Sequence, residues 1–130
     1  MDVMMKVYDA LMADEYIAAQ AGGRIKFYDY PTTLNFAGPA IVIDPISTEL
    51  DTDFADDKPI AEEYLYQIDV WTTNRKQTKE LARRVKDALR AVNFYYNGSG
   101  VDEYDKDSKI YRDARRFRGK VYSEDVKALS

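Results

Sequence analysis

The stretch EEYLYQIDVWTTNRKQTKELARRVKDALRAV, from Glu62 to Val92, decides the fold of this chain. In its first half, side chains that favour a half-buried strand recur at every second position: Tyr64, Tyr66, Ile68, Val70 and Thr72. In its second half, apolar side chains recur every three or four residues: Leu81, Val85, Leu89 and Val92. The first period is that of a strand with one buried face, and the second is that of an amphipathic helix. The sequence therefore predicts a strand over 62–73 that runs directly into a helix ending near Val92.

Asn74 directly precedes this helix, and Gln77 lies three residues after Asn74. An asparagine at the cap accepts a backbone hydrogen bond through its side chain, and a glutamine three residues later completes a capping-box pattern. Outside its apolar stripe the helix is basic, with Arg83 and Arg90 among its cations. We expect this basic flank to be exposed and available for contacts between proteins.

The residues before this block predict one helix and two strands. An apolar stripe over 2–20 predicts a helix with Asp2 as its N-cap and Gly22-Gly23 as its end, because glycine tolerates the left-handed conformation. A strand follows over 24–30 and is closed by Pro31. The segment AIVI at 40–43 predicts a short buried strand. Residues 46–61 are acidic and predict a long loop that contains Asp51, Asp53, Asp56 and Asp57.

The residues after this block predict one further strand. Residues 94–96 form a short aromatic segment, 97–100 form a turn, and 102–107 are polar. A strand is expected over 109–122, and its imperfect alternation indicates a bulge or an edge position. The last eight residues, 123–130, are expected to form a loose helical turn.

Together these elements predict one α+β domain over residues 1–130, in the order α-β-β-β-α-β. About four strands should form a mainly antiparallel sheet, with two helices packed on one face. The chain has 130 residues, of which 45% are hydrophobic, so a substantial core is expected.

The composition excludes several classes of function. The chain has no Cys and no His, which excludes disulfide scaffolds, thiolate metal sites and a Ser-His-Asp triad. Neither a signal peptide nor an apolar run of about 20 residues is present, so we expect synthesis in the cytoplasm and no membrane association. The acidic segments lack the spacing of a calcium loop, and no phosphate-binding motif occurs. We therefore predict no enzyme, no catalytic residue, no metal site and no cofactor.

The charges are unevenly distributed along the chain. Residues 44–73 carry nine acidic side chains against one lysine, whereas residues 74–120 carry fourteen basic side chains against seven acidic ones. The opposite charges could pair within one molecule, or they could form complementary edges between identical subunits.

Two groups of side chains on the predicted strands are candidates for contacts. The first is basic with interleaved aromatic residues, and it contains Arg112, Arg115, Arg116 and Arg118. It could contact protein, form a solvated face or bind nucleic acid, although a sequence pI near 4.9 argues against the last. The second is Trp71 with Leu65, on the polar side of the strand at 62–73. Those two form either a contact surface or a site covered by a loop of the same chain.

The strand YQIDVW at 66–71 and the capped helix with Glu80-Leu81-Ala82 and Asp87-Ala88-Leu89 resemble the tail-completion, or tail-terminator, proteins of long-tailed bacteriophages. The late strand with Tyr111-Arg112 and Arg116-Phe117 also fits, and so does an N-terminal helix followed by a strand. The resemblance spans residues 3–122, but the acidic segment 46–61 does not match it.

This resemblance implies a virion protein at the head-tail junction. It implies a ring of identical subunits, usually a hexamer, that caps the head-proximal end of the tail tube and docks onto the head connector. Tail tube protein and connector protein would be its partners, and DNA would only pass through the lumen. Asp51, Asp53, Asp56 and Asp57 could line that lumen and repel phosphates. Two alternatives remain: a head-side closure or adaptor protein of the same virion, and a small nucleic-acid-binding regulator.

Overall fold

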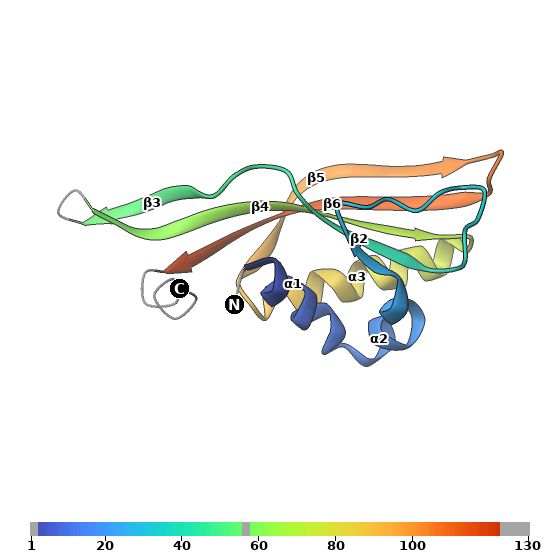
Figure 1. The fold of residues 1–130 in the computed structure, drawn as a ribbon, viewed down its shortest axis with the longest axis horizontal. Coiled ribbons are helices and arrows are strands. Elements are labelled where there is room, and N and C mark those ends of the chain that lie inside the picture. The colour runs from blue at the N-terminus through green and yellow to red at the C-terminus, as the bar shows by residue number, and fades with distance from the viewer. Residues whose placement is uncertain (1–2, 56–57, 123–130) are drawn as a thin grey trace.

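The computed structural model describes residues 3–55 and 58–122 (Figure 1). Within these residues lie three α-helices: α1 (Val3–Met12), α2 (Glu15–Ala21) and α3 (Arg75–Arg90). They also contain six strands: β1 (Ile25–Phe27), β2 (Ala40–Pro45), β3 (Leu50–Ala55), β4 (Lys58–Thr72), β5 (Phe94–Asp105) and β6 (Ile110–Tyr122). A short 3-10 turn, η1 (Gly22–Arg24), joins α2 to β1. The predicted α+β class is confirmed, but the predicted number of strands and helices was too low.

The strands form one mainly antiparallel sheet, as the sequence predicts. Its order is β1-β2-β4-β6-β5, and β3 adds to β4 beyond this path. Only the pair β1 and β2 is parallel among the described strand pairs. The helices lie together on one face, and two hairpins extend beyond them at opposite ends of the long sheet (Figure 1). The sheet is therefore covered by helices only in its middle.

The predicted stripe on α3 forms the centre of the core. Leu81, Val85 and Leu89 are at most 2% exposed, and they belong to one cluster with Ile68 and Val70 of β4. Full burial of such a side chain stabilises a fold by about 1.5–3 kcal/mol. The period of the sequence therefore identified the packed face of both elements correctly.

Asn74 caps α3, but the capping box is not formed. The Asn74 Oδ1 atom accepts a hydrogen bond from the backbone N–H of Gln77 at 2.9 Å. The Gln77 side chain instead donates to Gln20 Oε1 at 2.9 Å. This contact ties the start of α3 to α2, so tertiary structure redirects a side chain that local sequence assigns to the cap.

The predicted helix over 2–20 is two helices. Asp14 interrupts it and becomes the N-cap of α2, because its side chain accepts from the Ile17 backbone N–H at 3.0 Å. The break lets both helices bury their apolar sides, and Leu11 and Ile17 are fully buried. Asp2, the predicted N-cap of the first helix, lies outside the described residues. Gly22 follows the end of α2 but has a right-handed φ of −54°, and the chain continues into η1.

The predicted acidic loop over 46–61 was wrong. Residues 50–55 form β3, and β4 begins at Lys58, with Leu50 opposite Glu63 and Ala55 opposite Lys58. The prediction failed because this segment has few apolar side chains. A ribbon with both faces open to solvent does not need them, since backbone hydrogen bonds hold its two strands together.

The predicted turn over 97–100 is a bulge within one long strand, β5. The register with β6 shifts between Tyr96, opposite Phe117, and Gly100, opposite Arg115. Gly100 has a φ of +149°, and a Cβ there would overlap the carbonyl oxygen of Ala114. Gly100 therefore allows close approach of the strands, and the segment does not reverse the chain.

The remaining strands differ from their predicted bounds or positions. The strand expected over 24–30 ends as β1 at Phe27, because Tyr28 adopts a φ of +62°. The strand expected over 40–43 extends to Pro45 as β2. The strand expected over 109–122 is confirmed as β6. It lies inside the sheet between β4 and β5, not at an edge, and the bulge is on β5. The last eight residues, 123–130, lie outside the described part.

Candidate interaction surfaces

The sheet face opposite the helices carries most of the predicted contact residues. The register of β4 and β6 places Trp71 opposite Arg112 and Leu65 opposite Arg118. Arg116 stands opposite Gln67 between these two pairs. All of these positions alternate with the helix-facing residues of the two strands, so they share one face. The structure thus brings together five of the eight predicted contact residues.

Asp69 organises this face although the sequence did not single it out. Its carboxylate is fully buried and accepts three hydrogen bonds: from Arg112 Nε at 2.6 Å, Trp71 Nε1 at 3.2 Å and Gln67 Nε2 at 3.0 Å. Desolvation lowers the pKa of Arg112, but the hydrogen bond to Asp69 and the charges of Asp69 and Glu103 together outweigh it, and the pKa is raised. The Arg112 guanidinium also lies 5.9 Å from the centre of the Trp71 ring. Arg112 and Trp71 are therefore held in place by their own chain.

The segment 28–39, which connects β1 to β2, reaches this cluster. The Tyr30 ring lies 6.3 Å from that of Trp71, and its hydroxyl donates to Asp44 Oδ2 at 2.5 Å. Burial first, and then this bond to Asp44, raise the pKa of Tyr30 above its usual value. Trp71 is half-buried, and the segment 28–39 lies beside it, which agrees with the interpretation that a loop of the same chain covers this site. A contact of Trp71 or Leu65 with another molecule stays a prediction.

Several charges of opposite sign pair within the molecule along β6. Arg118 Nε lies 2.9 Å from Glu63, and Lys120 Nζ lies 2.9 Å from Asp53. Arg116 Nε instead donates a hydrogen bond to the neutral side chain of Gln67 at 3.3 Å. The acidic and basic halves of the sequence are thus partly matched inside one chain. Because these side chains remain substantially exposed, such pairs add little to stability.

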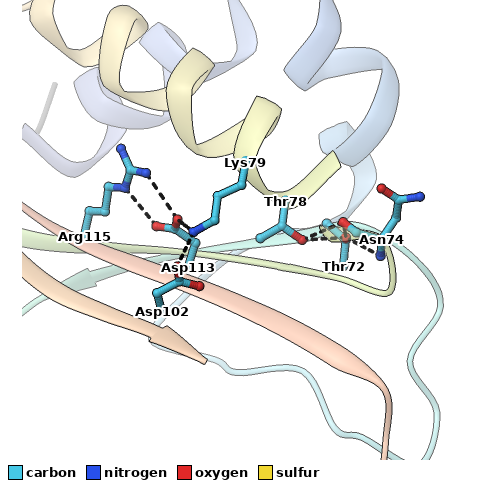
Figure 2. Close-up of polar contacts among 7 residues, drawn as sticks. All are labelled: Thr72, Asn74, Thr78, Lys79, Asp102, Asp113 and Arg115. Atoms are coloured by element: carbon cyan, nitrogen blue, oxygen red, sulfur yellow. Dashed lines mark hydrogen bonds and ion pairs between the residues drawn. The ribbon is translucent and has the colours of Figure 1, made fainter. Parts of the chain in front are cut away.

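Arg115 lies on the helix-covered face, apart from the other β6 arginines. Figure 2 shows it beside Asp113, which is 2% exposed and also accepts from Lys79 Nζ at 2.9 Å. Lys79 further pairs with Asp102 at 2.5 Å. Desolvation lowers the pKa of Lys79, but the bonds to Asp102 and Asp113 raise it above its usual value. This cluster fixes α3 over β5 and β6, which gives Arg115 a structural role.

Arg83 and Arg90 lie on the outer side of α3, as predicted, and both are exposed. Arg83 pairs with Glu80 on the preceding turn, and its side chain is 67% exposed. These two arginines belong to neither of the clusters on the sheet. The eight predicted contact residues therefore do not form one continuous site.

The hairpin of β3 with the first part of β4, residues 50–55 and 58–63, is called the arm here. It extends past the helices at one end of the sheet (Figure 1). Leu50 is 64% exposed and Phe54 is 63% exposed, which is unusual for large apolar side chains. Of the predicted lumen residues, Asp51 is exposed on β3 and Asp53 is bound to Lys120, whereas Asp56 and Asp57 lie outside the described residues.

A groove of about 500 Å³ lies where β5 begins beside the end of β6. Its lining consists of Asn93, Tyr95, Tyr96, Asn97, Arg118, Gly119, Lys120 and Tyr122. Both charged residues among them are basic. Tyr95 is 51% exposed, Tyr96 39% and Tyr122 49%. We refer to this site as the groove.

The sequence missed most residues of the groove and the apolar residues of the arm. Arg118 was a candidate in advance, and Lys120 and Tyr122 belong to the same basic and aromatic group of the last predicted strand. The tyrosine-rich segment at 94–96 was a usable signal, as were the apolar residues at 50 and 54 within an acidic run. Neither signal could be placed, because the pairing of the strands was unknown.

Within residues 3–55 and 58–122, no three acidic side chains converge to hold a metal ion. No helix in the same part of the chain is long and apolar enough to cross a membrane.

Comparison with known proteins gives one family and one fold. The sequence profile of the family described as tail completion protein gp17 matches residues 5–121. No curated protein sequence matches significantly. Among solved structures, a chain from the virion of a native gene transfer agent particle shares the fold, with a TM-score of 0.69 and 20% identity. The match covers 92% of this chain and 94% of that chain.

Proposed function

Because this chain belongs to the tail completion protein gp17 family and is thus a structural virion protein of the bacteriophage tail, we propose that it closes the head-proximal end of the tail tube. In this proposal, identical subunits form a ring that stops tube growth and docks onto the head connector. The observation that carries it is the family match over residues 5–121, which includes α2, α3, all but the first two residues of α1 and nearly all of the sheet.

The shape of the subunit supports assembly into a ring. The arm and the groove are different surfaces of one chain, and contacts between unlike surfaces close into a ring when the rotation permits. The fold shared with a chain of a gene transfer agent virion adds support, because that chain also belongs to an assembled particle.

Depletion and add-back would test this function. Particles assembled without the chain should give free heads and tail tubes of irregular length, as seen by negative-stain electron microscopy. Purified chain added to such tails should restore joining. Restored joining with tubes of unchanged, irregular length would contradict the capping role.

Binding to purified partners separates the head-side alternative from the tail-side role. A tail-closing protein should bind tail tubes before it binds the connector. A head-side adaptor should bind the connector alone, so co-sedimentation with each partner distinguishes them.

The third alternative, binding of nucleic acid, has less support in the structure. Arg112, Arg115 and Arg118 are each paired with a carboxylate of the same chain. We expect no fluorescence shift with single-stranded or duplex DNA at physiological salt. A salt-dependent complex under these conditions would favour the regulator.

The role of the acidic arm in a DNA passage stays a prediction. Replacing Asp51, Asp53, Asp56 and Asp57 with asparagine should leave tails assembled and change DNA ejection. Normal ejection by such particles would argue against the passage.

A further inference from the structure

We propose that the arm of one copy of this chain docks in the groove of a second copy. The proposal rests on the proposed function in one respect, because it names the surfaces that join neighbouring subunits of the ring. It commits to a second copy as the occupant of the groove.

The arm exposes apolar surface that no other described part of the chain covers. The register of β4 with β6 begins at Ala61, opposite Tyr122. In the described chain, residues 58–60 therefore have β3 as their single neighbouring strand. A two-stranded ribbon is only marginally stable alone in water, and exposed apolar patches mark contact sites. Leu50 and Phe54 thus need a covering surface that residues 3–55 and 58–122 do not supply.

The groove offers a surface of matching chemistry. Its tyrosine rings can pack against Leu50 and Phe54, and their hydroxyls can remain in water. The edge of β6 is also open at this location. β5 starts at Phe94, opposite Gly119, so the residues of β6 after Gly119 have no partner in β5. An extended ribbon can therefore approach without displacing a strand of the described sheet.

Charge favours this pairing. Asp51, Asp53, Glu62 and Glu63 give the arm four carboxylates, against one lysine at its end. Neither of the two charged groove residues is acidic. Arg118 and Lys120 already bind Glu63 and Asp53 of their own chain, but their side chains remain 58% and 39% exposed. Each cation has further N–H donors, so it can accept a second carboxylate from another copy.

Two ion pairs, Lys120–Asp53 and Arg118–Glu63, join the arm to groove residues of its own molecule, but Leu50 and Phe54 stay 64% and 63% exposed. β4 is one strand of 15 residues, which spans about 50 Å at the usual rise of a strand. It continues from the sheet into the arm without interruption, and the arm points away from the helix-covered body (Figure 1). The contact therefore joins unlike surfaces of two molecules, which propagates around a ring.

Cross-linking can test the contact directly, because the chain has no native cysteine. One preparation would carry Phe54→Cys in the arm, and a second would carry Tyr95→Cys in the groove. The two are mixed with a short bis-maleimide linker, with and without tail tubes, and a linked pair can then form only between molecules. Because a docked neighbour has an effective concentration in the millimolar range, we expect about tenfold more mixed dimer than from random collision.

A matched control replaces the groove cysteine with Leu34→Cys. Leu34 is 92% exposed in the segment between β1 and β2, so its cysteine is fully accessible but lies outside the groove. Mixed dimers of Phe54→Cys with Tyr95→Cys that do not exceed this control, with or without tails, would overturn the proposal. Specific cross-linking should also fall severalfold when the groove chain carries Arg118→Glu and Lys120→Glu, and an unchanged yield would contradict the role of charge.

The outcome is separable from that of the proposed function. If the chain restores head-tail joining but shows no arm-to-groove cross-link above the control, the docking proposal fails and the function stands. If the cross-link is specific but joining is not restored, the docking proposal stands and the proposed function fails. Neutralising Asp51 and Asp53, the two aspartates of the arm, also distinguishes the two roles of the arm, since docking predicts weaker assembly and a DNA passage predicts intact tails.

Discussion

The two halves of β4 differ sharply although they form one continuous strand. Residues 66–72 lie between β2 and β6 under the helices, and Ile68 and Val70 are each 1% exposed. Residues 58–60 pair with β3 at the end of the arm, where Ile60 is 38% exposed. Burial therefore holds residues 66–72 in place, whereas residues 58–60 depend on local pairing with β3. The comparison teaches that the core explains the fold, and that the arm, which the core does not need, is free to make the contact that we propose between copies of the chain.

Hydrogen exchange should show the largest difference between the two halves. Amides of residues 66–72 should open only with global unfolding, whereas those of the arm open locally. With typical global stabilities of 5–15 kcal/mol, exchange should be slower in the core by about three orders of magnitude or more. Exchange of the free protein followed by mass spectrometry measures this, and equal protection of both halves would remove the distinction. Slower exchange of the arm in assembled tails would extend the comparison.

Truncation of matched side chains should separate the halves by stability. Leu89→Ala removes a fully buried side chain of α3 and should lower the free energy of unfolding by about 2–5 kcal/mol. Phe54→Ala in the exposed arm should change it by less than about 0.5 kcal/mol. Urea denaturation of the two variants gives both values. A large loss of monomer stability in Phe54→Ala would mean that the arm is part of the core.

Two carboxylates that share Arg112 test whether burial or charge matters more on the open sheet face. Asp69 is fully buried, whereas the Glu103 side chain is 57% exposed. Asp69→Asn should destabilise the fold by about 1.5–3 kcal/mol, the range for hydrogen bonds to charged groups. Glu103→Gln should cost less than about 1 kcal/mol because water screens that pair. Similar losses from both changes, measured by denaturant unfolding, would contradict this ranking.

The smallest expected effect is the pH dependence of stability that comes from Tyr64, the residue that directly follows the arm on β4. Burial, followed by the charge and hydrogen bond of Glu62, raises its pKa to about 12 from the usual 10.0. The folded state thus favours the neutral phenol, and this contribution to stability is complete below pH 10 and is lost as the pH rises toward 12. NMR of ring-labelled tyrosines should show the late titration.

The matched variant is Glu62→Gln, which should lower this pKa but leave it above that of a free tyrosine, because burial remains. Titration of Tyr64 at its ordinary pKa in the unaltered chain would show that the root of the arm is open to water.

The success of sequence reasoning followed the source of each structural signal. Leu81, Val85 and Leu89 lie on the packed face because a helix period is a property of the chain itself. The loop predicted over 46–61 was wrong because β3 and the start of β4 both lie within this polar segment, and each is a strand through its pairing with the other. The glycines at 98 and 100 were misjudged for a related reason: glycine serves a turn or a bulge equally well, and only the neighbouring strand decides between them.

The sequence by itself determined the α+β class, the strand-to-helix block, the cap at Asn74 and the family to which the chain belongs. These depend on periodicity and on local side-chain chemistry, which the order of residues contains directly. Only the tertiary structure decided that Asp69 gathers Arg112 and Trp71, that Arg115 faces the helices, and where the arm and the groove lie. Each of these depends on strand register, which is set by contacts between residues far apart in the chain.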